Sequence, residues 1–500
     1  MTPTAVADGL VTRTDVELVP DPSRVTGLLF LPGQEMAIVG ASRAAGVVGR
    51  CLAMDDDDAR DTLERVTRAH AGRHRDVDAL FEANFEAVAH RVEDAASLAR
   101  DRRLLIGACF TQEFALEAAA LFNPSLVAHP DQDDPHGGLR LVMSLRAVGE
   151  GHLSSIVFTS ATLRGTSART TRLRLDPRSP WSTLGRVSGG PLHRVPLRHE
   201  ALTAGADEET VRFVLDDLPD VFSRDTLDVA LGRLDEQRLT RVEADATIDT
   251  LRRVAAESYE VSFAEQTELS ERTLRPATAR ESRGVEDARF VRFTAADGSR
   301  TYLGTYTSYD GSRVSVSRIR TDDFRTFTVS PMTGFAAADK GLALFPRTVG
   351  GRHLALSRWD RENNALASSA DGNHWDDAVP LQEPTRPWEL IHLGNCGSPI
   401  ETEQGWLVLT HAVGPVRTYA IGALLLDLDE PARVLGRLRE PLLTSADDER
   451  DGYVPNVVYS CGSLRHGDTL VLPYGCSDAR VRVAAVDLPA LLDRLLTDGP

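Results

Sequence analysis

The feature that most constrains the fold is a strand-rich pattern that recurs five times in this 500-residue chain. Each unit begins with an apolar stretch, passes a turn and continues with two further strands. The expected first strands lie at 122–130, 285–293, 341–349, 396–403 and 454–462, and the second at 139–148, 300–309, 352–360, 405–413 and 469–476. Units of three or four short strands at a period of roughly 40–60 residues are typical of a β-propeller. The sequence therefore predicts a mainly β fold, a five-bladed β-propeller.

Two tracts lack this pattern. Between 55 and 103, and again between 207 and 258, apolar residues recur at intervals of three and four, as in amphipathic helices. The second tract falls between the first and second strand units. We therefore predict an α-helical N-terminal region over 1–120 and a propeller domain over 121–500, with a helical insertion at about 205–260 between blades one and two. The many acidic residues of both tracts are expected to form solvated helical surfaces.

Charge and hydropathy exclude several classes of protein. The chain has 56 Lys and Arg against 74 Asp and Glu, a net charge of −18, which disfavours nucleic-acid binding because phosphates need a basic face. No segment approaches the ~18 continuous apolar residues of a membrane span. The first residues, MTPTAVADGL, lack the basic and apolar regions of a secretory signal. Five cysteines, not spaced as a metal site, suit a reducing compartment, so we expect a cytoplasmic protein.

Lys340 is the only lysine of the chain, since all other basic residues are arginine. A genome that favours arginine codons would explain this by chance survival. The alternative explanation is that a compact ammonium is required at this position, where a planar guanidinium would not fit. Composition alone does not decide between them.

The expected first strands carry polar residues where a propeller blade comes nearest the central channel. These residues are Asn123, Glu286, Asp287, Arg289, Asp339, Lys340, Asn395 and Asn456. Because side chains alternate along a strand, we expect Asp287 and Arg289 to share one face and Glu286 to point the other way. Asp287 and Arg289 would then form a buried pair in a pocket, unless they are only an ion pair that pins two blades.

The second strands add Arg146, Arg358 and His411, and Asp478 follows the second strand of the fifth unit. Taken alone, His411 is more simply a core histidine. Taken together, the set holds many cations and few carboxylates. Hydrolysis of a glycosidic bond normally needs two carboxylates. When phosphate is the nucleophile no base is needed, and cations hold the dianion instead. The pattern therefore favours phosphorolysis over hydrolysis.

Several motifs resemble those of glycoside hydrolase family 130, the β-mannoside phosphorylases and their hydrolytic relatives, over about 121–495. The matching stretches, in order, are Phe122-Asn-Pro124, Gly284-Val-Glu-Asp-Ala-Arg289, Lys340-Gly-Leu-Ala-Leu-Phe-Pro346, Gly405-Trp-Leu-Val-Leu-Thr-His411, Gly436-Arg437 with Arg439-Glu-Pro441, and Val454-Pro-Asn-Val-Val458. One such motif would be weak, but this series in the same order is specific.

The resemblance implies a five-bladed propeller and an inverting reaction on a β-linked mannoside, which gives α-mannose 1-phosphate when phosphate attacks. It makes Asp287 the general acid, acting through a sugar hydroxyl. The phosphate-binding residues it implies are Arg146, Arg289, Lys340, Arg358 and His411, and the substrate-binding residues are Asn123, Glu286, Asn456 and Asp478. Its placing of Lys340 in a motif favours the functional explanation of that lysine.

The chain also departs from the family pattern. Ala288 replaces the proline of one motif, and residues 395–400 replace a proline-rich stretch, so we expect a different acceptor side of the pocket. The N-terminal region and the insertion have no counterpart in compact members. They either cap the channel, restricting substrates to short oligosaccharides, or build a homo-oligomer interface.

The leading hypothesis is thus a cytoplasmic phosphorylase of a short β-1,2- or β-1,4-linked mannooligosaccharide. It needs inorganic phosphate as co-substrate but neither a metal nor an organic cofactor, and no nucleic-acid or membrane partner. An inverting β-mannosidase is the alternative, with Glu286 or another channel carboxylate as base. The third hypothesis is a propeller that only binds glycans.

Overall fold

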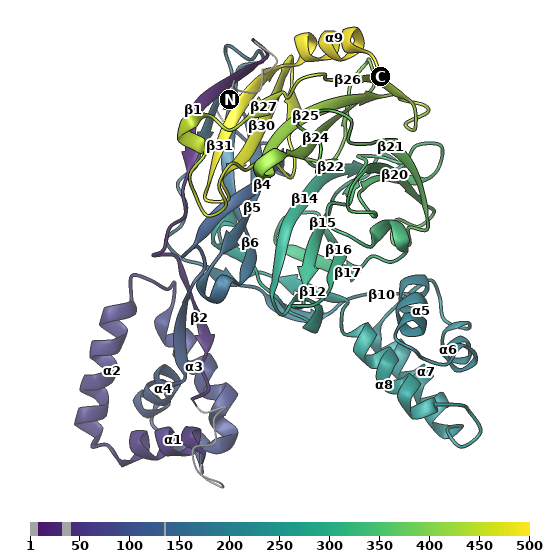
Figure 1. Ribbon diagram of the computed structural model, residues 1–500. Coiled ribbons are helices and arrows are strands. Elements are labelled where there is room, and N and C mark those ends of the chain that lie inside the picture. Colours follow the sequence, from purple (N-terminus) through teal and green to yellow (C-terminus); the bar gives the residue numbers. More distant parts are fainter. Residues whose placement is uncertain (1–8, 33–41, 135–136) are drawn as a thin grey trace.

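The computed structural model describes residues 9–32, 42–134 and 137–500. Most of the N-terminal stretch from which we expected no secretory signal lies outside these ranges. The molecule is a mainly β body from which two separate helical modules project (Figure 1). Within the described ranges, no helix has the length and apolar character needed to cross a membrane.

The β body contains five successive groups of antiparallel strands, as the sequence predicts, and the first two groups are joined in one sheet by a parallel pairing of Ser154 with Gly284. The first group is β4 (Ala120–Ala128), β5 (Leu139–Val148), β6 (Ser154–Arg164) and β7 (Arg172–Leu175), and the second is β14 (Gly284–Thr294), β15 (Arg300–Tyr309), β16 (Val314–Thr321) and β17 (Thr326–Pro331). The third is β18 (Ala343–Leu344), β19 (His353–Ser357), β20 (Asn364–Ser369) and β21 (Asp377–Gln382). The fourth is β22 (His392–Asn395), β24 (Trp406–Gly414), β25 (Thr418–Leu426) and β26 (Val434–Arg437), with the short β23 (Ile400–Glu401) beside β24.

The fifth group joins the two ends of the described chain. It contains β28 (Val458–Tyr459), β30 (Thr469–Cys476) and β31 (Arg480–Asp487), and its outer strand is β1 (Val11–Leu18), antiparallel to β31. The strand that precedes the N-terminal helices therefore belongs to the β body, although we assigned residues 1–120 to an extension.

The second strands of the groups carry most of the core. All nine residues of β24 are buried, and β5 and β30 pack apolar side chains against their neighbours on both sides. The first strand of the fourth group, β22, lies before the expected 396–403, where the structure has only the short β23. The first strands of the third and fifth groups are much shorter than expected, with only two residues in β18 and two in β28. The backbone turns into the left-handed region at Gly341 and Asn456, just before these two strands, and this ends the extended conformation.

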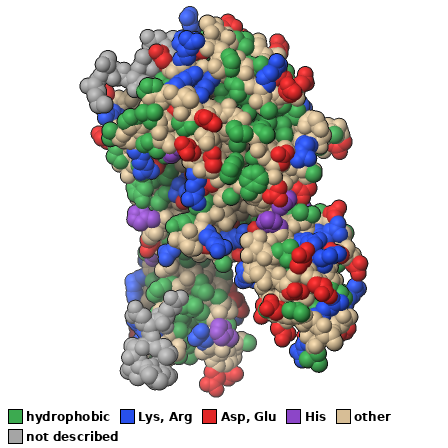
Figure 2. Space-filling model, turned by 45° about the vertical axis from the view of Figure 1, so that its right-hand side comes forward, with side chains coloured by type: hydrophobic (Ala, Val, Ile, Leu, Met, Phe, Trp, Pro, Cys, Tyr) green, Lys and Arg blue, Asp and Glu red, His purple; other side chains and the backbone are tan. Residues whose placement is uncertain are grey.

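The helical insertion lies between the first and second groups, as predicted. It contains α5 (Arg194–Thr203), α6 (Glu208–Leu215), α7 (Arg224–Glu236) and α8 (Ala244–Ala255), and it starts earlier than the expected 205. Leu215, Leu234 and Leu251 are fully buried in its own core. Charged side chains of both signs cover its outer surface (Figure 2), which confirms the expectation of a solvated face.

The N-terminal module consists of α1 (Arg43–Ala53), α2 (Asp56–His70), α3 (Val77–Val88) and α4 (Arg100–Cys109), beside the two-stranded ribbon of β2 (Val25–Leu29) and β3 (Thr111–Ala115). The periodicity predicted α2, α3 and the start of α4, but it missed the rest of α4 and α1. Helix α1 contains two glycines, which lower helix propensity, and it is held by packing of Val48 and Cys51 on α4 and α3. Arg75 of this module forms an ion pair with the buried Glu271 of the body.

Candidate functional site

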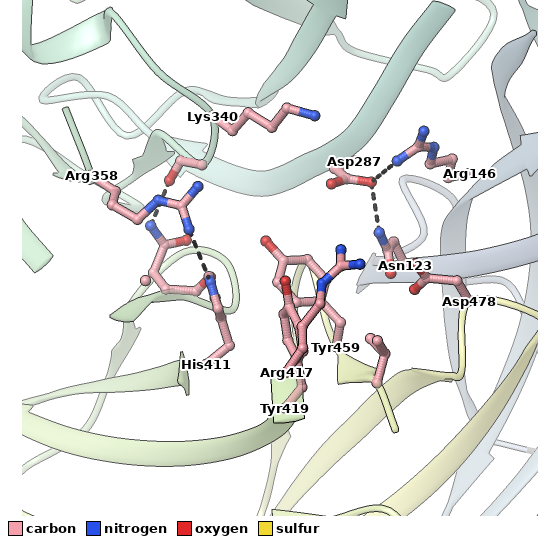
Figure 3. Close-up of a pocket in the computed structure, with 14 residues that line it drawn as sticks. Asn123, Arg146, Asp287, Lys340, Arg358, His411, Arg417, Tyr419, Tyr459 and Asp478 are labelled. Atoms are coloured by element: carbon pink, nitrogen blue, oxygen red, sulfur yellow. Dashed lines mark hydrogen bonds and ion pairs between the residues drawn. The ribbon is translucent and has the colours of Figure 1, made fainter. Parts of the chain in front are cut away.

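A pocket lies where the five strand groups meet, and each group contributes to its wall (Figure 3). Its lining residues are Asn123, Arg146, Asp287, Lys340, Gly341, Arg358, Gly394, Asn395, His411, Arg417, Tyr419, Val457, Tyr459 and Asp478. Seven of these were predicted as site residues from the sequence. Positions up to 355 residues apart in the chain therefore share one cavity, from Asn123 to Asp478.

An unusual backbone conformation brings several of these side chains to the pocket. Four lining residues, Asn123, Asp287, Gly341 and Asp478, have positive φ, between 49° and 92°, and so does Asn456 beside the lining residue Val457. Asn, Asp and Gly are the residue types that adopt this left-handed conformation at least cost. In β4 and β14 the strand register also shifts at this point, between Phe122 and Ser125 and between Glu286 and Arg289. Each break re-aims a side chain that regular alternation would have turned elsewhere.

The break in β14 makes the expected alternation of Glu286 and Asp287 wrong. Both carboxylates contact Arg146: its Nη2 lies 2.7 Å from Glu286 Oε1 and its Nη1 lies 3.5 Å from Asp287 Oδ1. Lys340 Nζ lies 2.7 Å from the other oxygen of Glu286. The left-handed φ of Asp287 is the physical reason, because it rotates two successive side chains toward the same neighbour. Glu286 therefore holds two cations of the pocket in place.

Arg289 is also placed differently from the expected pair with the Asp287 carboxylate. It is buried, and its Nη1 donates to the Asp287 backbone carbonyl at 2.8 Å. Its Nη2 donates to the Tyr459 hydroxyl at 2.5 Å. The carboxylate of Asp287 pairs with Arg146 instead. Arg289 thus holds two lining residues, Asp287 and Tyr459, in position, and its charge still acts on Asp287.

Asp287 is a buried carboxyl held by donors and cations. Asn123 Nδ2 donates to Asp287 Oδ1 at 2.7 Å. Burial by itself would raise the pKa of Asp287, but the charges of Arg146, Arg289 and Lys340 outweigh it and hold this pKa below the usual value. Asp287 is therefore ionised at neutral pH.

Asp478 lies in the same pocket, but its pKa is shifted in the opposite direction. Burial and the negative charge of Asp287 raise the pKa of Asp478 to about 7, although Arg146 and Arg417 work against the shift. Two carboxyls whose pKa values are pushed apart in one site are a common arrangement for acid–base chemistry.

The opposite wall of the pocket is cationic. Arg358 pairs with Asp339 at 3.3 Å, and its Nη1 lies 3.5 Å from His411 Nε2. His411 Nδ1 lies 3.0 Å from the Asn395 carbonyl and donates to it, which leaves the lone pair of Nε2 toward Arg358. Burial, followed by the charge of Arg358, lowers the pKa of His411 well below its usual value. His411 is therefore neutral.

Asn456 is the predicted site residue whose side chain is engaged elsewhere. Its Oδ1 accepts a hydrogen bond from Arg450 Nε at 3.0 Å, and it does not line the pocket. Its backbone carbonyl accepts from the N–H of Tyr419, a lining residue. A direct contact of Asn456 with a sugar stays a prediction.

The structure adds lining residues that we did not select from the sequence, namely Arg417, Tyr419 and Tyr459. The ring of Tyr419 stacks on His411 with a centroid distance of 6.1 Å. Tyr459 follows the motif residues Val457 and Val458, so the motif itself was an available signal. Arg417 lies in the hairpin between β24 and β25, where no periodicity marks it. Among the described residues it has no hydrogen bond or ion pair partner, and it is exposed at the pocket rim.

Comparison with known proteins agrees with the motifs. The family model for glycoside hydrolase family 130, described as β-1,4-mannooligosaccharide phosphorylase, matches residues 248–496. The 1,2-β-oligomannan phosphorylase of Thermoanaerobacter sp. is 33% identical over 227 residues, which are 42% of this chain and 71% of that protein. The chain belongs to glycoside hydrolase family 130. The resemblance drawn from the motifs is thereby confirmed, and with it the prediction of an enzyme of this phosphorylase family.

Other members of family 130 match at similar levels. The β-1,2-mannobiose phosphorylase of Listeria innocua is 31% identical over 42% of this chain and 60% of its own length. The β-1,4-mannooligosaccharide phosphorylase of Ruminococcus albus is 30% identical over 38% of this chain and 60% of its own length. The solved structure of the Listeria innocua enzyme with β-1,2-mannobiose aligns at a TM-score of 0.47 and 20% identity, covering 77% of this chain and 93% of that one.

Within the described residues, no group of three or more His, Cys, Asp and Glu side chains is arranged to hold a metal ion. The chemistry of the pocket is instead that of guanidinium, ammonium and carboxyl groups around a polar cavity. Such a site is suited to a ligand that combines hydroxyl groups with an anion.

Proposed function

We propose that the protein cleaves a short β-linked mannooligosaccharide with inorganic phosphate, with inversion, to give α-mannose 1-phosphate. The observation that carries the proposal is the excess of cations around Asp287. Arg146, Lys340, Arg358 and Arg417 all line the pocket with it. A phosphate dianion compensates such an excess, whereas a water molecule would leave it uncompensated.

In the proposed reaction a phosphate oxygen attacks the anomeric carbon, and the bond from that carbon to the glycosidic oxygen breaks. The proton of Asp287 passes through a sugar hydroxyl to the leaving oxygen, as the family resemblance implies. Lys340 and Arg358, on the side of the pocket facing Asp287, would hold the phosphate (Figure 3). Arg146 and Asn123 would hold Asp287 in position.

Electrostatics link phosphate binding to the proton of Asp287. Three cations lower the pKa of Asp287: its neighbours Arg146 and Arg289, and Lys340, which we assign to the phosphate site. A bound dianion offsets their charge, so the pKa of Asp287 rises when phosphate binds. In this proposal Asp287 is thus protonated only when the phosphate nucleophile is bound. Asp478 would bind hydroxyls of the nonreducing sugar, as a donor when protonated and as an acceptor when ionised.

We infer that the five strand groups are the blades of the predicted propeller and that the pocket is one mouth of its channel. The support is that first-strand residues of all five groups, or residues beside them, meet in the pocket. The linkage is a finer proposal. We place β-1,2 before β-1,4 because the two relatives of higher identity named above act, by their names, on β-1,2-linked mannosides.

The test is incubation with β-1,2- and β-1,4-mannobiose, with and without inorganic phosphate, followed by measurement of α-mannose 1-phosphate and free mannose. We expect phosphate-dependent α-mannose 1-phosphate. Free mannose formed regardless of phosphate would instead support the inverting β-mannosidase. Sugar binding without turnover in either condition would support the glycan-binding hypothesis.

A further inference from the structure

Two cysteines face each other in the N-terminal module, at sequence positions that precede all residues of the pocket described above. Cys51 lies in the last turn of α1, and Cys109 is the last residue of α4. Their Sγ atoms are 3.6 Å apart. A disulfide requires a sulfur–sulfur distance of about 2.05 Å, so a small rotation of the two side chains would suffice to form the bond.

The helices that carry the two thiols are fixed relative to each other. Arg102 of α4 donates to the backbone carbonyls of Cys51 and Met54 at 2.6 and 3.1 Å, and to Asp56 Oδ1 at 2.5 Å. These bonds satisfy free carbonyls at the end of α1. Val48 of α1 packs in the same apolar cluster as Ile106 of α4. The thiols are therefore held close by the fold, with no rearrangement of the helices needed.

The two thiols differ in access and in ionisation. Cys109 is exposed, whereas Cys51 is 5% exposed. The hydrogen bond from the Cys51 thiol, aided by the charge of Arg50, lowers the pKa of Cys109 to about 7 against the effect of burial, and the Cys51 pKa is raised. An accessible thiolate beside a second thiol is the arrangement of redox-sensitive cysteine pairs.

The remaining three cysteines provide a contrast. Cys396, Cys461 and Cys476 are at most 2% exposed. Burial raises the pKa of Cys396 and of Cys476 to about 12. A buried thiol with a raised pKa is unreactive toward oxidants. The structure thus separates one reactive pair from three inert residues.

We propose that Cys51 and Cys109 form an oxidisable dithiol that closes to a disulfide on reaction with hydrogen peroxide. The Cys109 thiolate attacks one peroxide oxygen, the O–O bond breaks and hydroxide leaves, which gives a sulfenic acid on Cys109. The Cys51 sulfur then attacks the Cys109 sulfur, the S–O bond breaks, and the hydroxide that leaves takes the Cys51 proton as water. In total, two thiols and one peroxide yield one disulfide and two water molecules. The bond links α1 to α4 across 58 positions of the chain.

The test uses the reduced full-length protein with hydrogen peroxide in slight molar excess. Thiols are counted under denaturing conditions with a maleimide, and the cross-linked peptides are identified by mass spectrometry. We expect the five thiols to fall to three, with a linkage between Cys51 and Cys109, and dithiothreitol to restore all five. Loss of no thiol, or a disulfide between two chains through Cys109, would overturn the proposal.

Three variants separate the two chemical steps. Cys51→Ser keeps a hydrogen-bond donor beside Cys109, so it should allow the first step but not the second, and a dimedone adduct should accumulate on Cys109. Cys109→Ser should lose no thiol under the same conditions. Cys476→Ser is the matched control at a buried site and should behave like the wild type. Circular dichroism establishes that each variant is folded. A folded Cys51→Ser protein whose Cys109 gives no dimedone adduct would exclude Cys109 as the site of attack.

Discussion

The carboxylates at the start of α2 and those at the pocket belong to the same residue types, but the first are exposed to solvent and the second are buried among cations. Asp56 and Asp57 of α2 have side chains that are 89% and 85% exposed. Asp287 and Glu286 are 8% and 6% exposed and contact several cations. In water a charge is solvated and its partners matter little, whereas in a buried site each neighbour changes the ionisation. The comparison teaches that position, and not residue type, decides what an aspartate does here.

The largest expected effect of breaking this contrast is at Asp287. Asp287→Asn keeps the shape of the side chain but removes the proton that we assign to the leaving group. We expect kcat for phosphorolysis to fall by about 10²- to 10⁴-fold, the usual contribution of general acid–base catalysis. The measurement is initial rates of α-mannose 1-phosphate formation together with sugar binding by calorimetry. Asp57→Asn on α2 is the matched control. Full turnover in the Asp287 variant would remove this residue from the catalytic role.

Lys340→Arg tests whether the single ammonium of the chain is needed in the pocket. The longer, planar guanidinium cannot reproduce the contact with Glu286 and the reach into the cavity. We expect the KM for phosphate to rise at least about tenfold, which corresponds to ~1.4 kcal/mol, with a smaller change in the KM for the mannoside. Arg60→Lys on α2 makes the reverse exchange at an exposed site and should change neither constant. An unaltered KM for phosphate in Lys340→Arg would support the other explanation, that this lysine survives by chance in a genome that favours arginine codons.

Asp478 should make the stability of the protein depend on pH. Its pKa is raised from 3.8 to about 7, so between these values the folded state binds a proton that the unfolded state has released. The free energy of unfolding therefore decreases as pH rises from about 4 to about 7. Asp478→Asn removes this dependence, and we expect it to gain about 1 kcal/mol over wild type between pH 5 and pH 8, after allowance for partial exposure. Urea unfolding at the two pH values measures it. Parallel curves for both proteins would contradict the raised pKa.

Arg417 tests the rim of the pocket. It is exposed and forms no hydrogen bond or ion pair among the described residues, so its guanidinium is available to a ligand. We expect Arg417→Gln to raise the KM for phosphate about fivefold, because a charge at a wet rim contributes ~1 kcal/mol. Arg361→Gln is the matched control, an exposed arginine already paired with Asp339. If Arg417→Gln changed only the KM for the mannoside, its role would be with the sugar.

The smallest effect is expected in α2 itself. Asp55 is the N-cap of this helix, and its side chain accepts from the Asp57 N–H at 2.9 Å. Asp55→Ala should destabilise the N-terminal module by ~0.5–1 kcal/mol and leave turnover unchanged. Thermal unfolding and the phosphorolysis assay measure the two quantities. A loss of activity in this variant would show that the module communicates with the pocket.

Long buried strands were the most predictable part of the fold. The expected second strands at 139–148, 300–309 and 469–476 coincide with β5, β15 and β30. Each is buried for most of its length, so its composition follows one simple requirement. First strands were overestimated where Gly341 and Asn456 turn the backbone, since a left-handed residue breaks a strand without changing its apolar content.

The candidate site was predictable as a set of residue types and not as a geometry. Asn123, Arg146, Asp287, Lys340, Arg358, His411 and Asp478 were all selected from the sequence, and all line one pocket. The residues that surround them in the pocket, and contacts elsewhere in the fold, were not predicted from the sequence. Arg417 lies in a hairpin with two successive left-handed residues, and Cys109 meets Cys51 only through the packing of α1 on α4.

The sequence by itself determined the five strand units, the two helical modules and the series of motifs, because strand and helix periodicities and short motifs are properties of neighbouring residues. The tertiary structure alone decided that Glu286 and Asp287 share Arg146. It also decided that the pKa of Asp287 falls while that of Asp478 rises, and that Arg289 bonds to the backbone of Asp287 instead of its carboxylate. These properties depend on burial and on charges contributed by distant strands. Electrostatic interactions act through space, and no local pattern of residues records which charges the fold will bring together.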